Sequence, residues 1–247
     1  MTAVLAQLGR EFAAFFYSPI AYVLLAFSIL ANGITFLLIV EFLSNPYSSH
    51  GAALQTLFGG TVFFYILLLG SASLITMRSL AEERHSGTIE TLLTAGIGDT
   101  QVVLAKYLAA LAFNGILWLP TLLYPAILAR HSAIDIGPVL AGYLGTFGIG
   151  AMFLAIGLLA STLTRSQIVA ALLSLGANFA LFLVPIFTFV RPTAESGSVL
   201  AHINLWLHME DFGRGIVDSR WLIYYGSVIA FALFAAAQAL QSRRWRA

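Results

Sequence analysis

The chain has 247 residues, of which 60% are hydrophobic and only 9% are charged, and its mean hydropathy is +0.91. Soluble domains carry about a quarter charged residues, so this composition excludes an ordinary soluble protein and indicates lipid surroundings. The formal net charge of +1 gives no basis for nucleic-acid binding, and the absence of cysteine excludes a disulfide framework and thiol chemistry.

The N-terminal residues 2–17 are predicted to form a short amphipathic helix. Such a helix would lie in the inner interface of the membrane, with its apolar side against the lipid. The alternative is that these residues are the frayed start of the first span. Apolar residues recur three and four apart on one side and polar residues occupy the other: Val4, Leu8, Phe12 and Phe15 against Gln7, Arg10 and Glu11.

Six uncharged runs follow, each long enough to cross a bilayer as a helix of roughly 20 residues. Helices are expected because a segment in hydrocarbon must satisfy its backbone hydrogen bonds internally, whereas barrel strands need only about 10 residues. The fold class is therefore an all-α integral membrane protein, with one transmembrane domain over residues 1–247. The first run lacks a signal-peptide cleavage pattern and is read as a retained helix. The runs are Ile20–Val40, Leu54–Met77, Tyr107–Ala129, Ile136–Thr164, Ser166–Val190 and Leu222–Ser242.

The distribution of lysine and arginine predicts the orientation, because these residues favour cytoplasmic connections. With the N-terminus inside, eight of the twelve lie on the inner side and four on the outer side. Six spans return the C-terminus to the inner side. We therefore predict a multi-pass protein of the bacterial inner membrane with both termini cytoplasmic. The inner set is Arg10, Arg78, Arg84, Lys106, Arg165, Arg243, Arg244 and Arg246, and the outer set is Arg130, Arg191, Arg214 and Arg220.

The cytoplasmic segment 78–100, between the second and third spans, is predicted to be a chain of short helices. Ser79 and Glu82 have the spacing of a capping box, which would restart a helix just after the second span. Asp99 is expected to cap the helix that enters the third span. An ordinary polar loop is the alternative.

Within this segment, Gly87 is expected to break the first short helix. Thr88 would cap a second one, and Glu90 in its first turn would favour the helix dipole. The apolar residues of this second helix share one face, which suits docking in a groove of another protein. They are Ile89, Leu92 and Leu93.

The third and fourth spans carry features of their own. Pro120 and Pro125 predict a bend in the outer half of the third span. Gly142, Thr146 and Gly150 are four apart in the fourth span, as are Gly157 and Ser161, and form a smooth stripe for helix packing, within one chain or between two. The alternative is the general enrichment of glycine in membrane helices.

Polar residues within the spans are few. Asn32, Asn114 and Asn178 could line a pathway or bond neighbouring helices. No cluster of His, Asp or Glu lies in the spans, so no catalytic residue is assigned. The outer segment 191–221 holds two histidines, but their spacing matches no compact metal motif, and an outer loop or re-entrant hairpin is expected instead. Four aromatic residues are expected to mark the outer headgroup level: Trp206, Trp221, Tyr224 and Tyr225.

The string Glu82-Glu83-Arg84-His85-Ser86-Gly87-Thr88-Ile89-Glu90-Thr91-Leu92-Leu93 resembles the signature of ABC-2 type transporter permeases. In that family this signature follows the second span and leads into a cytoplasmic coupling helix. Six spans with both ends inside agree with it over the whole chain. The outer stretch from Phe212 to Arg220 resembles, in addition, a segment of gliding-motility-type permeases.

The resemblance implies a permease subunit that works with a separate ABC ATPase. The chain has no phosphate-binding G-x-x-x-x-G-K-[ST] loop, so ATP and Mg²⁺ are expected in the partner, and the chain itself is not expected to be an enzyme or to hold a cofactor or metal. The family further implies a second permease subunit, identical or closely related, and leaves room for an extra periplasmic or membrane subunit.

The resemblance also implies roles for the signature residues. Glu82, Glu83 and Arg84 would form ion pairs that hold the gate helix against the coupling helix or the ATPase. Gly87 would separate the two helices. The remaining members would orient the coupling helix and fill the ATPase groove: Thr88 and Glu90 for the first task, and Ile89, Leu92 and Leu93 for the second.

The expected function is therefore an ATP-driven export permease. The alternative is a mechanical or assembly component that uses the same ATPase but acts on a periplasmic partner without moving solute. A secondary carrier driven by protons or sodium is disfavoured, because no acidic residue lies at mid-depth in the six predicted spans.

Overall fold

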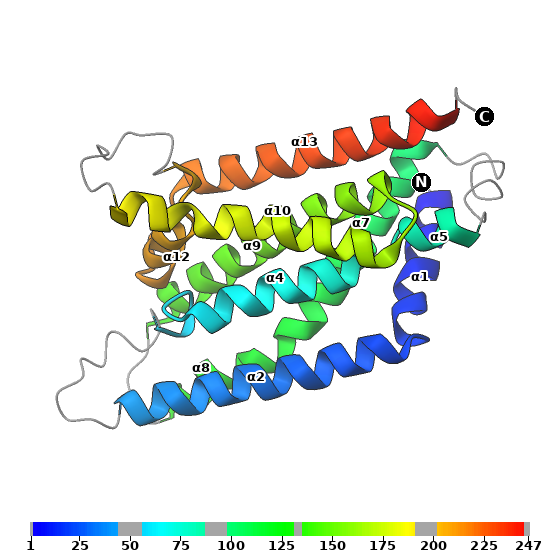
Figure 1. The fold of residues 1–247 in the computed structure, drawn as a ribbon. Coiled ribbons are helices and arrows are strands. Elements are labelled where there is room, and N and C mark those ends of the chain that lie inside the picture. The colour runs from blue at the N-terminus through cyan, green and yellow to red at the C-terminus, as the bar shows by residue number, and fades with distance from the viewer. Residues whose placement is uncertain (1, 44–55, 87–97, 131–134, 191–201, 245–247) are drawn as a thin grey trace.

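The computed structural model describes residues 2–43, 56–86, 98–130, 135–190 and 202–244, and within these ranges every regular element is a helix. Six of the helical segments are long and apolar enough to cross a membrane, which confirms the predicted fold class. They run side by side as a bundle (Figure 1). The elements are α1 Thr2–Phe16, α2 Pro19–Leu43, α4 Val62–Thr76, α5 Ala81–Ser86, α7 Asp99–Trp118, η1 Leu119–Leu122, α8 Leu123–Ala129, α9 Ile136–Leu163, α10 Gln167–Val190, α12 Leu205–Gly213 and α13 Ser219–Arg244.

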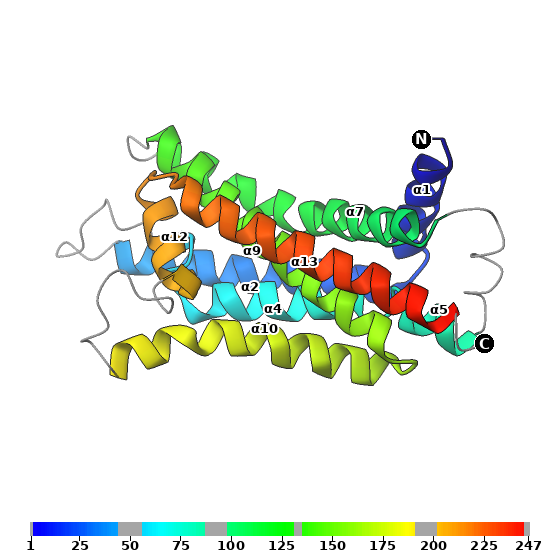
Figure 2. The same cartoon turned by 90° about the horizontal axis from the view of Figure 1, so that it is seen from above.

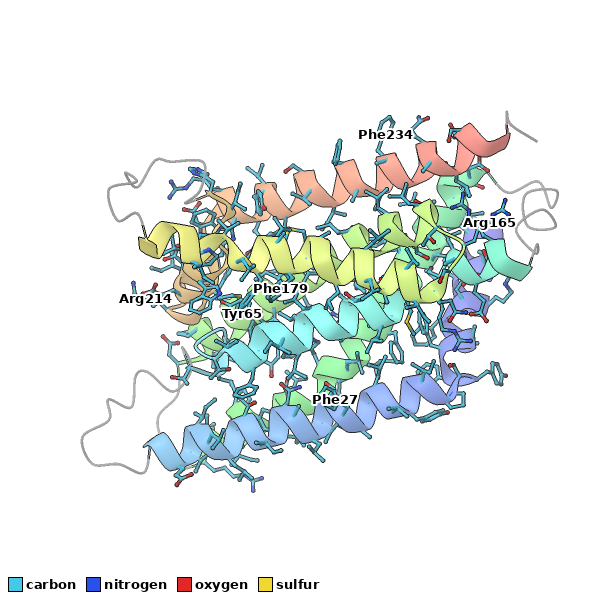
Figure 3. All side chains as sticks on the ribbon, in the orientation of Figure 1. Phe27, Tyr65, Arg165, Phe179, Arg214 and Phe234 are labelled. Carbon is cyan, nitrogen blue, oxygen red and sulfur yellow. The ribbon has the colours of Figure 1, made fainter. Side chains whose placement is uncertain are left out.

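The helix α9 forms the centre of the bundle. It packs against α4, α10, α12 and α13. Of the residues in its most apolar stretch, 72% are buried, compared with 17% for the corresponding stretch of α2. Small residues allow this, because a helix with many glycines and alanines lets its neighbours approach closely. The outward faces of α2, α10 and α13 instead expose large apolar side chains such as Phe27, Phe179 and Phe234, as lipid contact requires (Figure 3).

The two ends of the bundle differ. Helices α1 and α5 lie at one end together with the last turns of α13, and we call this the α5 end. Helices α12 and α8 lie at the opposite end, the α12 end. Figure 2 shows α1 lying across the α5 end rather than along the spans, which is the arrangement expected of a helix in a membrane interface.

The second and third spans begin elsewhere than the sequence predicted. The second span begins at Val62 rather than Leu54, because Thr61 caps α4 by accepting a hydrogen bond from the Phe64 amide. The third span begins eight residues earlier than predicted, at Asp99, and Lys106 lies inside its helix. The sequence predicted a helix that begins near Asp99, carries Lys106 and enters the third span, and α7 is this helix.

The predicted bend in the third span is an interruption of the helix. Between α7 and α8 the chain makes one 3₁₀ turn, η1, which contains Pro120. Proline cannot donate the backbone hydrogen bond of a regular helix, so the helix changes its winding there. The Thr121 hydroxyl bonds the Trp118 carbonyl at 2.6 Å and the Tyr143 hydroxyl at 2.9 Å, which fixes this turn against α9.

Candidate functional site

The short helix α5 follows the second span and receives its N-terminal cap from another helix. The Ser161 hydroxyl of α9 accepts hydrogen bonds from the backbone N–H groups of Leu80 and Ala81, both at 3.0 Å. These donors belong to the start of a helix, where no carbonyl of the same helix can bond them. The expected capping box of Ser79 and Glu82 is thus not the cap observed; the hydroxyl that serves this end comes from a residue about 80 positions away.

The contact between α4 and α9 one turn before this cap is unusually close. A Cβ on Gly157 would overlap the Thr76 hydroxyl and would lie 2.7 Å from the Ser174 hydroxyl of α10. The Ser174 hydroxyl donates to Ser73 of α4 at 3.0 Å. Only glycine allows this approach, and the approach brings Ser161 within reach of α5.

A buried lysine joins α5 to two other helices. The Lys106 ammonium of α7 lies 2.8 Å from a Glu83 carboxylate oxygen of α5 and 2.9 Å from a Glu11 carboxylate oxygen of α1. Only 2% of the lysine side chain is exposed, so its charge must be balanced by these carboxylates. Arg10 lies 3.1 Å from Glu11 and Gln7 donates to the same carboxylate at 2.8 Å. We call Glu11, Glu83 and Lys106 the lysine cluster.

Two further arginines tie the α5 region to its surroundings. Arg78, just before α5, bonds Glu82 through two nitrogens at 2.9 and 3.1 Å and donates to the Ser18 hydroxyl at 2.8 Å. Arg84 donates to the Thr162 carbonyl at the end of α9. Glu82, Glu83 and Arg84 therefore have partners within this chain: just before α5, on α7 and on α9, respectively.

The other residues of the signature lie outside the described part of the chain. These are Gly87, Thr88, Ile89, Glu90, Leu92 and Leu93, and the coupling helix predicted for them stays a prediction. After this segment, α7 begins at Asp99. The Gly98 amide before it donates to the Gln101 side chain at 3.3 Å, so Asp99 is the first residue of the helix and not its cap.

The glycine stripe of α9 faces different neighbours at its two glycines. A Cβ on Gly142 would overlap the ring of Phe58. Thr146 is buried and its hydroxyl donates to the Gly142 carbonyl at 2.8 Å. A Cβ on Gly150 would lie 2.9 Å from the Asn114 amide nitrogen. The stripe is therefore covered by side chains of the same chain, which come from α7 and from the turn before α4.

The three asparagines sit at three separate helix contacts. Asn32 donates to the Ser28 carbonyl at 2.8 Å, in the part of α2 that meets α7. Asn114 and Asn178 both face α9: the first opposite Gly150, the second through a 3.3 Å bond to the Phe153 carbonyl. Asn32 also borders a small cavity beside Tyr124 and η1, which neither of the other two lines.

At the α12 end, the outer segment folds back into the bundle. Helix α12 packs on α9 and buries His208 completely. The His208 ring stacks on Trp221 at 3.9 Å between centroids, and its Nδ1 lies 2.9 Å from the Tyr225 hydroxyl. Trp221 and Tyr225 are therefore core residues whose side chains pack against other parts of the chain, and their predicted placement at the headgroup level stays a prediction.

The stretch from Phe212 to Arg220 forms a structural turn between α12 and α13. Gly215 adopts a positive φ of 85°, which glycine tolerates and other residues avoid. Asp218 then accepts bonds from the Arg220 amide and guanidinium, both at 2.8 Å, and this bonding lowers the pKa of its carboxyl. The motif thus fixes the entry of the chain into the last span.

Sequence reasoning missed three residues of the site: Glu11, Lys106 and Ser161. Glu11 could have been found, since it lies on the polar side of the predicted N-terminal helix. Lys106 had a weaker signal, as a charge surrounded by alanine and leucine. Ser161 was noted with Gly157 only as a small residue suited to helix packing, because its function as a cap depends on a contact between helices distant in sequence.

The comparisons with known proteins agree with the resemblance drawn from the signature. The family model described as "ABC-2 family transporter protein" matches residues 39–208, more than two thirds of the chain. The match begins in α2, ends in α12 and includes α5, Lys106 and Ser161, whereas Glu11 precedes it. Among curated proteins no match was found.

Proposed function

The chain belongs to the ABC-2 family of transporter proteins, and from that premise we propose that it is the permease subunit of an ATP-driven exporter, coupled to a separate ATPase. As a member of this family with six candidate spans, it is a multi-pass membrane component of an ABC transporter. The proposal adds the coupling route, the direction of transport, and the bacterial inner membrane with the α5 end in the cytoplasm.

The observation that carries the proposal is the attachment of α5 to three other helices. The lysine cluster joins α5 to α1 and α7, and the Ser161 cap and Arg84 join it to α9. Residues 87–97, which contain the predicted coupling helix, follow α5 directly. A displacement of that segment by an ATPase would therefore be passed to α7 and to the central α9 as a rigid-body movement.

The chemistry of ATP hydrolysis is assigned to the partner. The sequence offers no phosphate-binding loop, so ATP and Mg²⁺ would bind to the ATPase subunit, and this chain would contribute only binding and movement. A second permease subunit, identical or closely related, would complete the membrane unit. The exposed apolar faces of α2, α10 and α13 offer it surface for contact.

The test is a charge reversal in the predicted coupling helix. Glu90→Lys should leave membrane insertion intact but should lower transport-coupled ATP hydrolysis at least tenfold, because it places the wrong charge at the docking surface. Co-purification of the ATPase in mild detergent should weaken in parallel. Glu41→Lys, at an exposed position at the far end of α2, is the matched control and should leave both readouts unchanged.

The proposal would be overturned by Glu90→Lys protein that retains its ATPase and its normal coupled hydrolysis. It would equally be overturned if the purified chain alone drove transport from an ion gradient, since a secondary carrier needs no ATPase.

A further inference from the structure

The α5 end contains a cavity of about 580 Å³ between α1, α2, α4, α5 and α7. Cavities of this size commonly hold small organic ligands. Six charged side chains border it, three cationic and three anionic, so the polar rim is balanced in charge. They are Arg10, Glu11, Arg78, Glu82, Glu83 and Lys106.

The polar and apolar parts of the cavity lie at different depths. On α7, Phe113 follows Lys106 by seven residues, which places it roughly 10 Å farther into the bundle. On α4, Leu74 precedes Arg78 by one turn on the inward side, and on α2 Leu24 lies deeper than the start of the helix at Pro19. The cavity is therefore charged near the end of the bundle and apolar toward its middle.

The cavity also communicates with the surroundings of the bundle. Leu74 borders it and still exposes 39% of its surface, and α2, which forms one wall, is the least buried span. We infer that acyl chains surround the bundle at the depth of Leu74, because this residue lies inside a candidate span. An occupant can enter from the lipid without passing through water.

The charges of the rim all have partners within the chain but differ in their exposure. Lys106 is enclosed by Glu11 and Glu83. Arg10 pairs with Glu11 and exposes 59% of its side chain, and Arg78 and Glu82 pair with each other and expose 35% and 45% of theirs, so that a headgroup could bond their exposed sides in addition. A phosphate could therefore bond the two arginines and a neighbouring ammonium could approach Glu82, whereas a purely anionic group would also meet the carboxylates.

We propose that this cavity binds a zwitterionic phospholipid of the adjacent leaflet, of the phosphatidylethanolamine class. Its phosphate lies beside Arg10 and Arg78, its ammonium lies beside Glu82, and the start of one acyl chain lies between Leu24, Leu74 and Phe113. The lipid fills the space between α2 and the rest of the bundle. The site is independent of any ATPase, so its test does not depend on the proposed function.

The test is lipid retention by the purified full-length chain, measured by native mass spectrometry and by the shift in melting temperature on lipid addition. One phosphatidylethanolamine per chain should be retained, with at least fivefold weaker retention of phosphatidylglycerol of the same acyl chains. Water-soluble glycerophosphoethanolamine at equal concentration should not displace the lipid, because it lacks the apolar contacts.

Two pairs of variants localise the site. Ala14→Trp should abolish retention by filling the cavity from α1, whereas Ala13→Trp, at the adjacent exposed position outside the cavity, should retain the lipid. Arg10→Gln should weaken retention about tenfold, as expected for the loss of one charge-assisted hydrogen bond. Arg165→Gln, an exposed arginine at the same end of the bundle but outside the cavity, should leave it unchanged (Figure 3).

Three outcomes would overturn the proposal. The first is equal retention of the two lipids, the second is displacement by the soluble headgroup alone, and the third is equal lipid binding by the Ala14→Trp and Ala13→Trp proteins. The melting temperature without added lipid shows that each variant is folded, so loss of binding cannot be ascribed to unfolding.

Discussion

At the residue scale, the lysine cluster shows how a charge can be kept inside a membrane protein. Removing a lysine from water costs several kcal/mol, and only close carboxylates offset this. Here two carboxylates lie within 3 Å of the Lys106 ammonium and come from different helices. The net negative charge of the lysine cluster is in turn balanced by Arg10, which pairs with Glu11. The cluster therefore holds only when α1, α5 and α7 are in their observed places.

Lys106→Met should destabilise the protein by about 3–5 kcal/mol, because two partly buried carboxylates lose their common cation. Chemical unfolding in detergent micelles measures this. The double variant Lys106→Met with Glu83→Gln should regain part of the loss, since one uncompensated charge is removed with its partner. Arg214→Gln breaks the exposed pair with Glu210 and should change stability by less than about 1 kcal/mol. Equal effects of the buried and exposed changes would contradict the role given to the cluster.

His208 makes stability depend on pH. Burial lowers the pKa of His208 from 6.5 to about 4. Between these values the unfolded chain binds a proton that the folded chain does not, so stability is present in full above pH 6.5 and falls as the pH drops toward 4. The expected loss over this window is about 3 kcal/mol. His208→Gln should flatten the stability curve between pH 6.5 and 4 relative to the unmodified protein, and parallel curves would contradict the argument.

At the scale of elements, the central position of α9 depends on its glycines, which have no side chain and let neighbouring helices approach closely. The Gly157 contact lets α4 and α10 meet at one point, and it sets the distance at which Ser161 reaches α5. A small-residue seam of this kind gives close packing where no hydrophobic effect between helices is available. The same helix therefore supports both the bundle and the α5 end.

Gly157→Ala should separate α4 from α9, because its Cβ would overlap the Thr76 hydroxyl. The cost of such overpacking is about 1–3 kcal/mol. Gly226→Ala is the matched control, since a Cβ there meets nothing within 4 Å on the exposed side of α13. Melting temperatures of the two variants in the same detergent check this, and equal melting temperatures would show that the α4–α9 contact can relax without cost.

At the scale of the whole molecule, the arrangement fixes which segments share a side of the membrane. Helices α1 and α5 and the C-terminal end of α13 lie at one end, and α12 lies at the other (Figure 1). The proposed orientation puts the α5 end inside. It would also place the proposed ATPase contact and the turn before α13 on opposite sides of the membrane.

The orientation can be tested directly because the chain has no cysteine. A single cysteine at Ser242, exposed near the end of α13, should resist a membrane-impermeant thiol reagent in intact cells. One at Val217, exposed beside α12, should react. The opposite labelling pattern would invert the orientation and remove the proposed access of a cytoplasmic ATPase to residues 87–97.

The sequence by itself determined the number of spans, the amphipathic N-terminal helix and the family, because these depend on properties local to one segment. The length of an apolar run, the obligation to bond its own backbone, and a contiguous signature can all be read without knowing the neighbours.

The tertiary structure alone decided the burial of Lys106, the Ser161 cap and the enclosure of His208 by Trp221 and Tyr225. Each is a contact between different helices, and for Lys106 and Ser161 the partners lie up to 95 residues apart. No local pattern encodes them, since a lysine or serine in a helix has the same sequence signature whether water or another helix faces it.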